Sequence, residues 1–405
     1  MTSLRPPLDT ALDTPLDSPL DPARDTARDA SFDPAPGAAQ APWRTTIVED
    51  LDVTYVPSAA NDRAVRRWLY ATMLSVLAVL VVGGITRLTE SGLSITVWKP
   101  VTGVLPPLTE SAWQHAFEQY QQIPEAQTVH AGITLEKFKT LFFWEWAHRL
   151  VARLVGLVIA IPFFVLLLGR RIRPELRLRM ANLPLLVTLQ GAMGWYMVQS
   201  GLSERTSVSQ YRLTAHLALA IVIYVVAAWT AFRLHPSDEG DAVAIDHTEP
   251  NAGALALSAL VFVVILTGGF VAGLDAGLVY NTFPLMGGSV VPPTYGDLSP
   301  MWRNWFENPA AVQFHHRTSA LLTLGIALWL AWRRRAASTD AAARTAWRFV
   351  QLAVVAQVSL GVATLLLHVP IPVAALHQAG AVGLLTATLY AAARDGVGRS
   401  GRAGA

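Results

Sequence analysis

The stretch FFWEWAHRLVARL, from Phe142 to Leu154, combines Glu145, a histidine and two arginines with the start of a long apolar run. The next fifteen residues, Leu154 to Leu168, are uncharged and mostly apolar. At 1.5 Å per residue they cover about 22 Å, less than the roughly 30 Å hydrocarbon core of a bilayer. If this run spans a membrane, the ionisable residues at its start, from Glu145 to Arg153, lie partly within the hydrocarbon core. Ionisable groups there cost several kcal/mol unless they have partners. The stretch therefore predicts both a membrane helix and a functional site.

The composition of the whole chain agrees with a membrane protein. Hydrophobic residues make up 52% of the 405 residues and charged residues 15%, which disfavours a soluble protein with buried helices. We predict an all-α integral membrane protein with eight transmembrane helices. They are expected near residues 66–87, 146–169, 180–199, 212–233, 254–273, 314–332, 347–367 and 373–393.

The distribution of Lys and Arg predicts the orientation of these spans. In the two long loops, 88–143 and 274–312, the only basic residues apart from histidine are Lys99, Lys137, Lys139 and Arg303. The shorter connections and the ends of the chain carry the remaining clusters, such as Arg63, Arg66, Arg67, Arg170, Arg171, Arg173, Arg333, Arg334, Arg335 and Arg394. By the positive-inside rule, both termini are cytoplasmic and the two long loops lie outside.

The N-terminal segment differs from the rest of the chain. Aspartates recur every four residues from Asp9 to Asp33, interrupted by prolines that break helices. We expect residues 1–60 to be a disordered tail, and we see no secretory signal. The expected organisation then comprises an N-terminal four-helix half (61–235), a cytoplasmic linker (236–253), a C-terminal four-helix half (254–395) and a disordered tail (396–405).

An internal repeat supports two pseudo-repeated four-helix bundles. GGITRLTESGL (83–93) aligns with GGFVAGLDAGL (268–278), and LQGAMGWYMV (189–198) aligns with AQVSLGVATL (356–365). His148-Arg149 pairs with His316-Arg317, and His216 pairs with His377. Chance similarity between apolar helices is the alternative, but the recurring His-Arg pair at the same position argues against it.

The four paired histidines suggest two haem sites. Each of these histidines lies near the start of a predicted span that runs from outside to inside. All four are therefore expected at a similar depth, near the outer face. Neutral histidine is a good axial ligand of haem iron, whereas the absence of cysteine excludes disulfides, iron–sulfur clusters and thiolate zinc sites. Arg149, Arg153 and Arg317 are candidates for pairing with haem propionates.

The other histidines are weaker candidates. His115 and His130 belong to the first outer loop, and His235 and His247 to a polar cytoplasmic loop, so all four are expected to be solvated. His315 neighbours His316 in sequence, but successive helical residues point about 100° apart. The repeat favours His316 as the ligand.

The two halves differ at one chemical position. Glu145 precedes His148 by three residues, on the same helical face, whereas Gln313 stands in the equivalent place before His316. Proton-coupled chemistry is therefore expected in the first half and a fixed, electron-relaying haem in the second. The alternative is that Glu145 only pairs with Arg149 at i+4.

Together these motifs resemble the haem A synthase family. The resemblance covers about 65–393 and rests on GGITRLTESGLSITVWKPVTGVLPP (83–107), EWAHRLVARLVG (145–156), LQGAMGWYMVQSGL (189–202), QFHHR (313–317) and HQAGA (377–381). It implies an eight-span enzyme of the bacterial inner membrane that oxidises the C8 methyl of haem O by two successive hydroxylations, giving the formyl group of haem A. It further implies that haem O binds the N-terminal half, that haem b binds the C-terminal half, and that Glu145 is needed for activity.

The resemblance has departures, and alternatives stay open beside it. The chain looks like the cysteine-free branch of the family, and Ala152 stands where a glycine is usual in H-R-x-x-G-R. Expected partners are membrane lipid, haem O synthase and cytochrome oxidase assembly factors, and no nucleic acid. A di-haem b-type membrane electron-transfer protein would explain the four histidines equally well, but not the difference between Glu145 and Gln313. A transporter would bind no haem.

Overall fold

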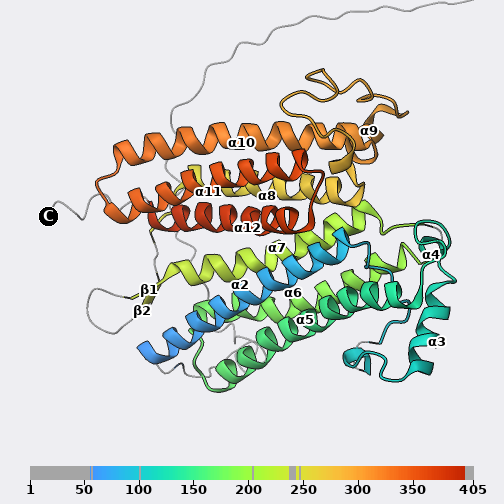
Figure 1. Ribbon diagram of the computed structural model, residues 1–405. Helices are drawn as coiled ribbons and strands as arrows, with labels where there is room; N and C mark the ends of the chain where they lie inside the picture. Colours follow the sequence, from blue (N-terminus) through green and yellow to red (C-terminus); the bar gives the residue numbers. More distant parts are fainter. Residues whose placement is uncertain are drawn as a thin grey trace, which may run out of the picture. The chain divides into compact units, whose positions relative to one another are not determined.

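The computed structural model describes residue 55 and residues 58–99, 102–202, 205–236, 243–245 and 248–396. Helices of 22 or more residues form in every range where a span was predicted (Figure 1). These are α2 (Ala59–Leu88), α5 (Leu135–Leu168), α6 (Pro174–Gln199), α7 (Gln210–Arg233), α8 (Ala252–Gly273), α10 (Pro309–Ala337), α11 (Ala341–Leu366) and α12 (Ile371–Arg394). Almost all of the predicted N-terminal tail lies outside the described residues, although α2 already begins at Ala59.

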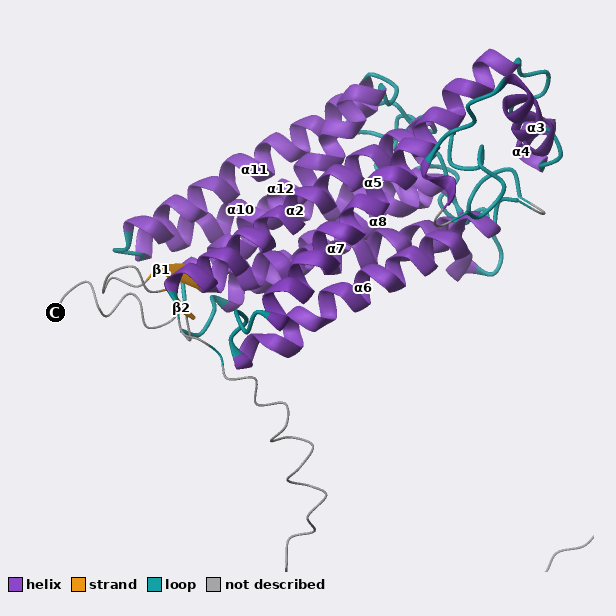
Figure 2. Ribbon diagram, turned by 90° about the horizontal axis from the view of Figure 1, so that it is seen from below, coloured by secondary structure: helices purple, strands orange, loops and turns teal. Residues whose placement is uncertain are grey.

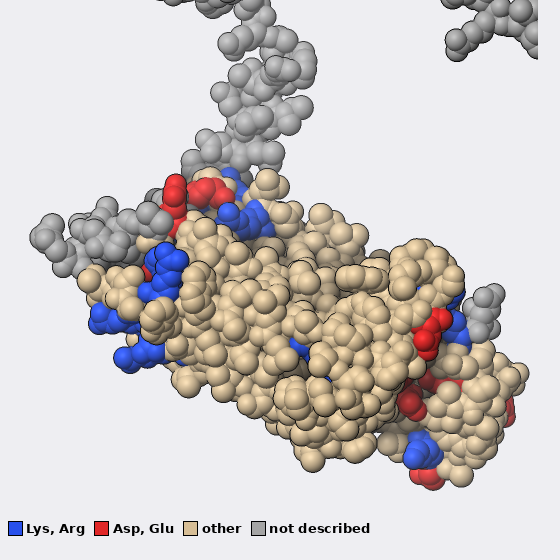
Figure 3. Space-filling model, turned by 90° about the horizontal axis from the view of Figure 1, so that it is seen from above, with Lys and Arg blue, Asp and Glu red and all other residues tan. Residues whose placement is uncertain are grey.

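Six of these helices, α2, α5, α7, α8, α11 and α12, are long and apolar enough to cross a membrane. Of the other two, α6 starts with Glu175, Arg177 and Arg179, and α10 carries the His316-Arg317 pair, so both are more polar. The surface drawn in Figure 3 has very few charged side chains across its middle, and Lys and Arg gather towards one end. The chain is a multi-pass membrane protein.

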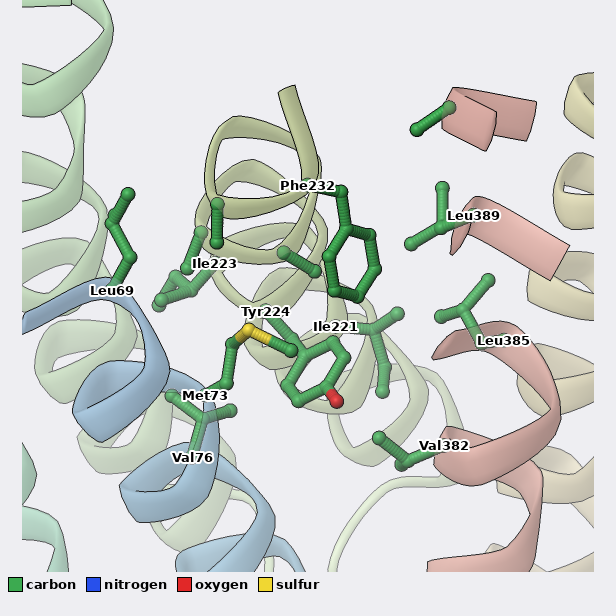
Figure 4. Packing of buried hydrophobic residues seen from close by; sticks show 14 of the residues in the cluster. Leu69, Met73, Val76, Ile221, Ile223, Tyr224, Phe232, Val382, Leu385 and Leu389 are labelled. Atoms are coloured by element: carbon green, nitrogen blue, oxygen red, sulfur yellow. The ribbon is translucent and has the colours of Figure 1, made fainter. Parts of the chain in front are cut away.

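The long helices pack in two neighbouring sets. In one set α2 and α6 each contact both α5 and α7, and in the other α8 and α11 each contact both α10 and α12. The sets meet where α2 and α7 pack against α12 and where α7 packs against α8. Figure 4 shows this junction, with Met73 of α2, Tyr224 of α7 and Leu385 of α12 turned towards one another. Tyr224 and Thr386 share a hydrogen bond of 2.7 Å there.

Polar residues begin several helices by satisfying their first backbone N–H groups. Thr134 caps α5, Asn251 caps α8, Asn308 caps α10 and Asp340 caps α11. A small antiparallel hairpin, β1 (Leu234–Pro236) with β2 (Val243–Ile245), follows α7, and the predicted linker begins at its Pro236 and includes β2. It occupies the end of the helices away from α3 and α4, as Figures 1 and 2 both show.

The predicted outer loop 88–143 contains helices, and the helix that follows it begins earlier than the predicted span. Helix α5 starts at Leu135 rather than near 146, because Thr134 caps it and Phe138, Leu141 and Phe142 bury one face of the added turns. The loop contains η1 (Thr102–Val104), α3 (Glu110–Tyr120) and α4 (Pro124–Gln127). Residues of α3, α4 and the first turns of α5, together with Leu93 and Val208, form a second apolar core, here called the outer-loop cluster. Its buried members are Leu93, Phe117, Tyr120, Ile123, Ala126, Phe138, Leu141, Phe142 and Val208.

The second long loop, 274–312, which is predicted to lie outside, also contains short helices. They are η2 (Ala276–Leu278), η3 (Met301–Arg303) and α9 (Asn304–Glu307), which leads into α10. Asn304 is fully buried and donates hydrogen bonds to Leu298 O at 2.7 Å and Met301 O at 3.1 Å. These bonds fix the loop at the N-terminal end of α10, beside His315 and His316.

Candidate functional site

Each of the four predicted haem ligands lies against a glycine of a neighbouring helix. A Cβ atom added at any of these glycines would meet the imidazole at 2.9–3.2 Å, closer than ordinary van der Waals contact. Only glycine therefore leaves these rings in place. The pairs are Gly83 with His148, Gly194 with His216, Gly268 with His316, and Gly361 with His377.

Two glutamines hold two of the histidines in the same way. Gln190 Nε2 donates to the backbone oxygen of His216 at 3.0 Å, and Gln357 Nε2 donates to that of His377 at 2.9 Å. Each amide nitrogen is also near its histidine's ring, at 3.3 Å from Nε2 of His216 and 3.1 Å from Nδ1 of His377. Gln190 and Gln357 were paired by the sequence repeat, so the structure places them in matching roles.

His316 and His377 face each other at a separation that suits one haem iron. Their ring centroids are 6.4 Å apart and their planes are 87° to each other. Two imidazole–metal bonds of about 2 Å on opposite sides of one ion would place the centroids roughly 6 Å apart. His316 Nδ1 is 2.9 Å from Thr267 Oγ1, and His377 Nδ1 is near Gln357, so Nε2 of both rings remains for iron. Such outer partners are typical of metal-binding histidines.

His148 and His216 form the corresponding pair in the first half. Each ring lies against its own glycine, His148 against Gly83 and His216 against Gly194. Among the described residues His216 Nδ1 is buried without a hydrogen-bond partner, as expected for a ring atom meant to bind something else. No group of three or more His, Asp or Glu in the described part of the chain could hold a bare metal ion. Facing pairs suit a macrocycle that supplies the other four ligands.

Glu145 is buried and fully hydrogen-bonded. Its Oε2 accepts from Ser94 Oγ at 2.7 Å and from the backbone N–H of Ile95 at 2.6 Å. Its Oε1 accepts from Arg149 Nε at 3.1 Å and Nη2 at 2.6 Å. The i+4 ion pair considered from the sequence therefore exists, and the acid also contacts the loop after α2, which the sequence did not indicate.

Gln313 occupies the matching place with weaker contacts. Its Oε1 accepts from Arg317 Nη2 at 3.2 Å, and its Nε2 donates to Tyr280 O at 3.2 Å. Arg317 Nη2 also donates to Tyr280 O at 2.5 Å, as Arg149 Nη2 donates to Ile95 O at 2.9 Å. The scaffold thus repeats, while the first half has a carboxylate and the second a neutral amide.

The segment after α2 lies against these arginines. The Arg149 guanidinium is 5.7 Å from the centre of the Trp98 ring, a cation–π distance. Arg153 Nη2 donates to Lys99 O at 3.0 Å. His315, in contrast, stacks on Trp305 at 4.4 Å and bonds Tyr295 Oη through Nε2 at 2.9 Å. The expectation that His315 points away from the His316–His377 pair is confirmed.

The sequence of the chain is similar to those of known proteins. The profile of the cytochrome oxidase assembly protein family COX15-CtaA matches residues 66–389. This chain belongs to that family. Among the chain's relatives, proteins named Heme A synthase are 45% identical over 339 residues in Nitrosospira multiformis and 47% identical over 337 residues in Mesorhizobium japonicum. The alignments cover 82% and 81% of this chain and 93% and 91% of the relatives.

One contact near the site was not predicted from the sequence. Gln378, next to His377, donates from Nε2 to Leu80 O on α2 at 2.8 Å. Its amide also lies against Gly84, the neighbour of Gly83. The double glycine and the HQ pair were visible, but the repeat alignment compares the halves and cannot show which residues join them.

Proposed function

We propose that this protein is a haem A synthase. It oxidises the C8 methyl of haem O by two successive hydroxylations, and the resulting gem-diol loses water to give the formyl group of haem A for cytochrome oxidase. The supporting observation is the combination of its relatives' name with a buried carboxylate, Glu145, three residues before His148, whose ring lies against Gly83. A di-haem electron-transfer protein needs no such acid.

The proposed architecture is eight spans in two repeated halves, with α6 and α10 also crossing the membrane. Both lie among apolar helices, and α10 repeats the polar head of α5. We place both termini in the cytoplasm of a bacterium and the α3–α4 loop outside its inner membrane, because Lys and Arg are concentrated in the other connections. In this orientation the four histidines lie near the outer face.

In the first half, His148 and His216 bind the iron of haem O and orient its ring so that the C8 methyl meets Glu145. Arg149 and Arg153 hold the propionates. Glu145 accepts protons as the methyl is oxidised, at the Oε2 atom now bonded to Ser94, because a hydroxyl can rotate and exchange its partner. Arg149 keeps Oε1 in place. General acid–base catalysis of this kind contributes about 10²- to 10⁴-fold in rate.

In the second half, His316 and His377 would hold haem b, with Arg317 near its propionates. When bound, haem b would supply one-electron redox chemistry. Gln313 has a neutral amide in the place of the Glu145 carboxylate, and an amide does not exchange protons as an acid or a base does. Its role is to position Arg317.

The test is the haem content of membranes that contain the protein. Cells that make haem O but lack their own haem A synthase should accumulate haem A when this protein is expressed, and extracted haems are identified by chromatography and mass spectrometry. Bound haem with an unaltered C8 methyl would favour the electron-transfer alternative. Purified protein without any haem would favour a transporter.

A further inference from the structure

A second buried acid lies in the outer-loop cluster and has no role in the proposed function. Glu125 of α4 is 5% exposed, and its Oε2 is 3.4 Å from the hydroxyl of Tyr120, which is fully buried. Burial, together with the charges of Glu145 and Glu90, raises the pKa of Glu125 to about 8, although the Tyr120 hydrogen bond and Arg87 oppose the shift. Glu125 therefore changes protonation near neutral pH rather than in acid.

Tyr120 connects this acid to a histidine. The same hydroxyl is 2.6 Å from His130 Nδ1. Because a phenol has a single proton, it donates to one neighbour and accepts from the other. Either protonated Glu125 donates to Tyr120 and Tyr120 donates to His130, or protonated Nδ1 of His130 donates to Tyr120 and Tyr120 donates to the Glu125 carboxylate. Changing from the first arrangement to the second moves one proton outward from Glu125 to His130.

The contacts continue to the surface. His130 Nε2 is 3.5 Å from Glu90 Oε2, and the side chains of these two residues are 15% and 48% exposed. The prediction that His130 is solvated is therefore wrong, because α3 and α4 enclose it, whereas His115 is exposed as predicted. Exposure rises from the buried acid to Glu90, which can exchange protons with water.

The inner end of this series adjoins the candidate active site. Glu125 and Tyr120 both interact with the charge of Glu145. Phe142, one helical turn before Glu145, and Leu93, the neighbour of Ser94, belong to the same cluster as Tyr120. Glu145 itself is 2% exposed, so its protons need a route to water.

We propose that Glu125, Tyr120, His130 and Glu90 form a proton relay between Glu145 and the water outside α3 and α4. This inference rests on the proposed function. The Glu125 carboxylate accepts a proton released on the Glu145 side. Glu125 then passes one to Tyr120 as Tyr120 gives its own to His130, and His130 releases its Nε2 proton to Glu90 and water. Before the next cycle His130 returns from the Nδ1–H to the Nε2–H tautomer by exchanging protons with water, and the Tyr120 hydroxyl turns back towards Nδ1. One proton then enters and one leaves in each cycle, and no electron moves along the relay.

The test uses two nearly isosteric variants, Glu125→Gln and Tyr120→Phe, with Glu136→Gln as the control. Glu136 is a carboxylate at the start of α5 whose side chain is 81% exposed. Purified proteins with bound haem b and haem O are assayed for haem A formation from pH 6 to about 9, a range around the pKa of Glu125. The haem b spectrum and the amount of bound haem O are measured for each.

We expect both relay variants to form haem A at least about tenfold more slowly, with haem b and haem O retained. Since only the carboxylate of Glu125 can accept a proton, the wild-type rate should rise with pH up to about 8 and then level off. Glu125→Gln should lose this rise, and Glu136→Gln should keep it.

Two results would overturn the relay. One is a wild-type rate and pH profile in Glu125→Gln, and the other is loss of haem binding in parallel with activity in both variants, which would indicate a structural role. Failure of the wild type itself to make haem A is a different result: it contradicts the proposed function and removes the reaction that the relay would serve.

Discussion

Gln378 of α12 donates a hydrogen bond to Leu80 of α2, with 2.8 Å between Nε2 and the carbonyl oxygen. The contact joins the two candidate haem sites through neighbouring residues. Gln378 follows His377, and it lies against Gly84, which follows the glycine that faces His148. A displacement at this crossing would therefore reach the ligands of both sites.

Gly84→Ala should destabilise the protein by about 1–3 kcal/mol, the usual cost of overpacking. The added Cβ would lie 1.7 Å from Gln378 Oε1, so the amide must leave its place and lose the bond to Leu80. Thermal unfolding of the purified protein measures the effect. Gly191→Ala in α6 is the control, because no atom lies within 4 Å of the Cβ it would add. Equal stability of the two variants would show that Gln378 adjusts freely.

Replacing His316 or His377 with alanine should remove most of the bis-histidine haem b spectrum. Each ring is one half of the facing pair, and its loss leaves only one axial ligand. Absorption spectra of the purified variants give the result. His315→Ala should keep the spectrum, since that ring stacks on Trp305 instead. An unchanged spectrum in both ligand variants would refute the assignment.

Local and repeated features of the structure were predicted from the sequence, whereas contacts between distant residues were not. The repeat paired Gly194 with Gly361 and Gln190 with Gln357, and the structure gives the members of each pair equivalent contacts. Apolar stretches of about 20 residues likewise predicted the long helices. These features are local or duplicated, so they leave a pattern in the sequence.

The errors have a common cause. The surroundings of His130 depend on α3, α4 and the extra turns of α5 coming together, and residues 88–143 have no partner of similar content in the second half. The bonds of Ser94 and Ile95 to Glu145 join residues about fifty positions apart. Neither hydrophobic periodicity nor the repeat could indicate such contacts.

Glu145→Gln should retain haem b and bind haem O but form little or no haem A. The substitution gives the first half the amide that Gln313 already provides in the second, and it removes the proton acceptor without changing size. Extracted haems separated by chromatography measure the yield, and Glu136→Gln serves as the exposed control. A normal yield of haem A would leave Glu145 as a structural partner of Arg149 and Ser94 only.

The segment 90–99 should become resistant to chymotrypsin when haem O is bound. Trp98 is 45% exposed but lies over Arg149, which is proposed to bind a propionate. Binding there would order the segment and slow cleavage after Trp98. Cleavage is followed by mass spectrometry with and without haem O, and cleavage after the 59% exposed Trp302 in the other outer loop is the internal reference. Equal cleavage at Trp98 in both samples would show that bound haem O does not protect this segment.

Glu125→Gln should make the protein more stable, relative to wild type, as the pH rises. In the folded protein the pKa of Glu125 is raised from 4.5 to about 8, so between these values the folded state binds more protons than the unfolded state. Stability from this group is then lost as pH increases through that window. Glutamine has no such dependence, so the difference in stability between variant and wild type should grow from about pH 5 to pH 8 and then stay constant.

Unfolding at a series of pH values measures this difference, with Glu136→Gln expected to follow the wild type. A variant that gains stability while losing activity would separate the proton-transfer role of Glu125 from any structural one. A constant difference across the pH range would instead mean that the Glu125 carboxyl is not buried in the native protein.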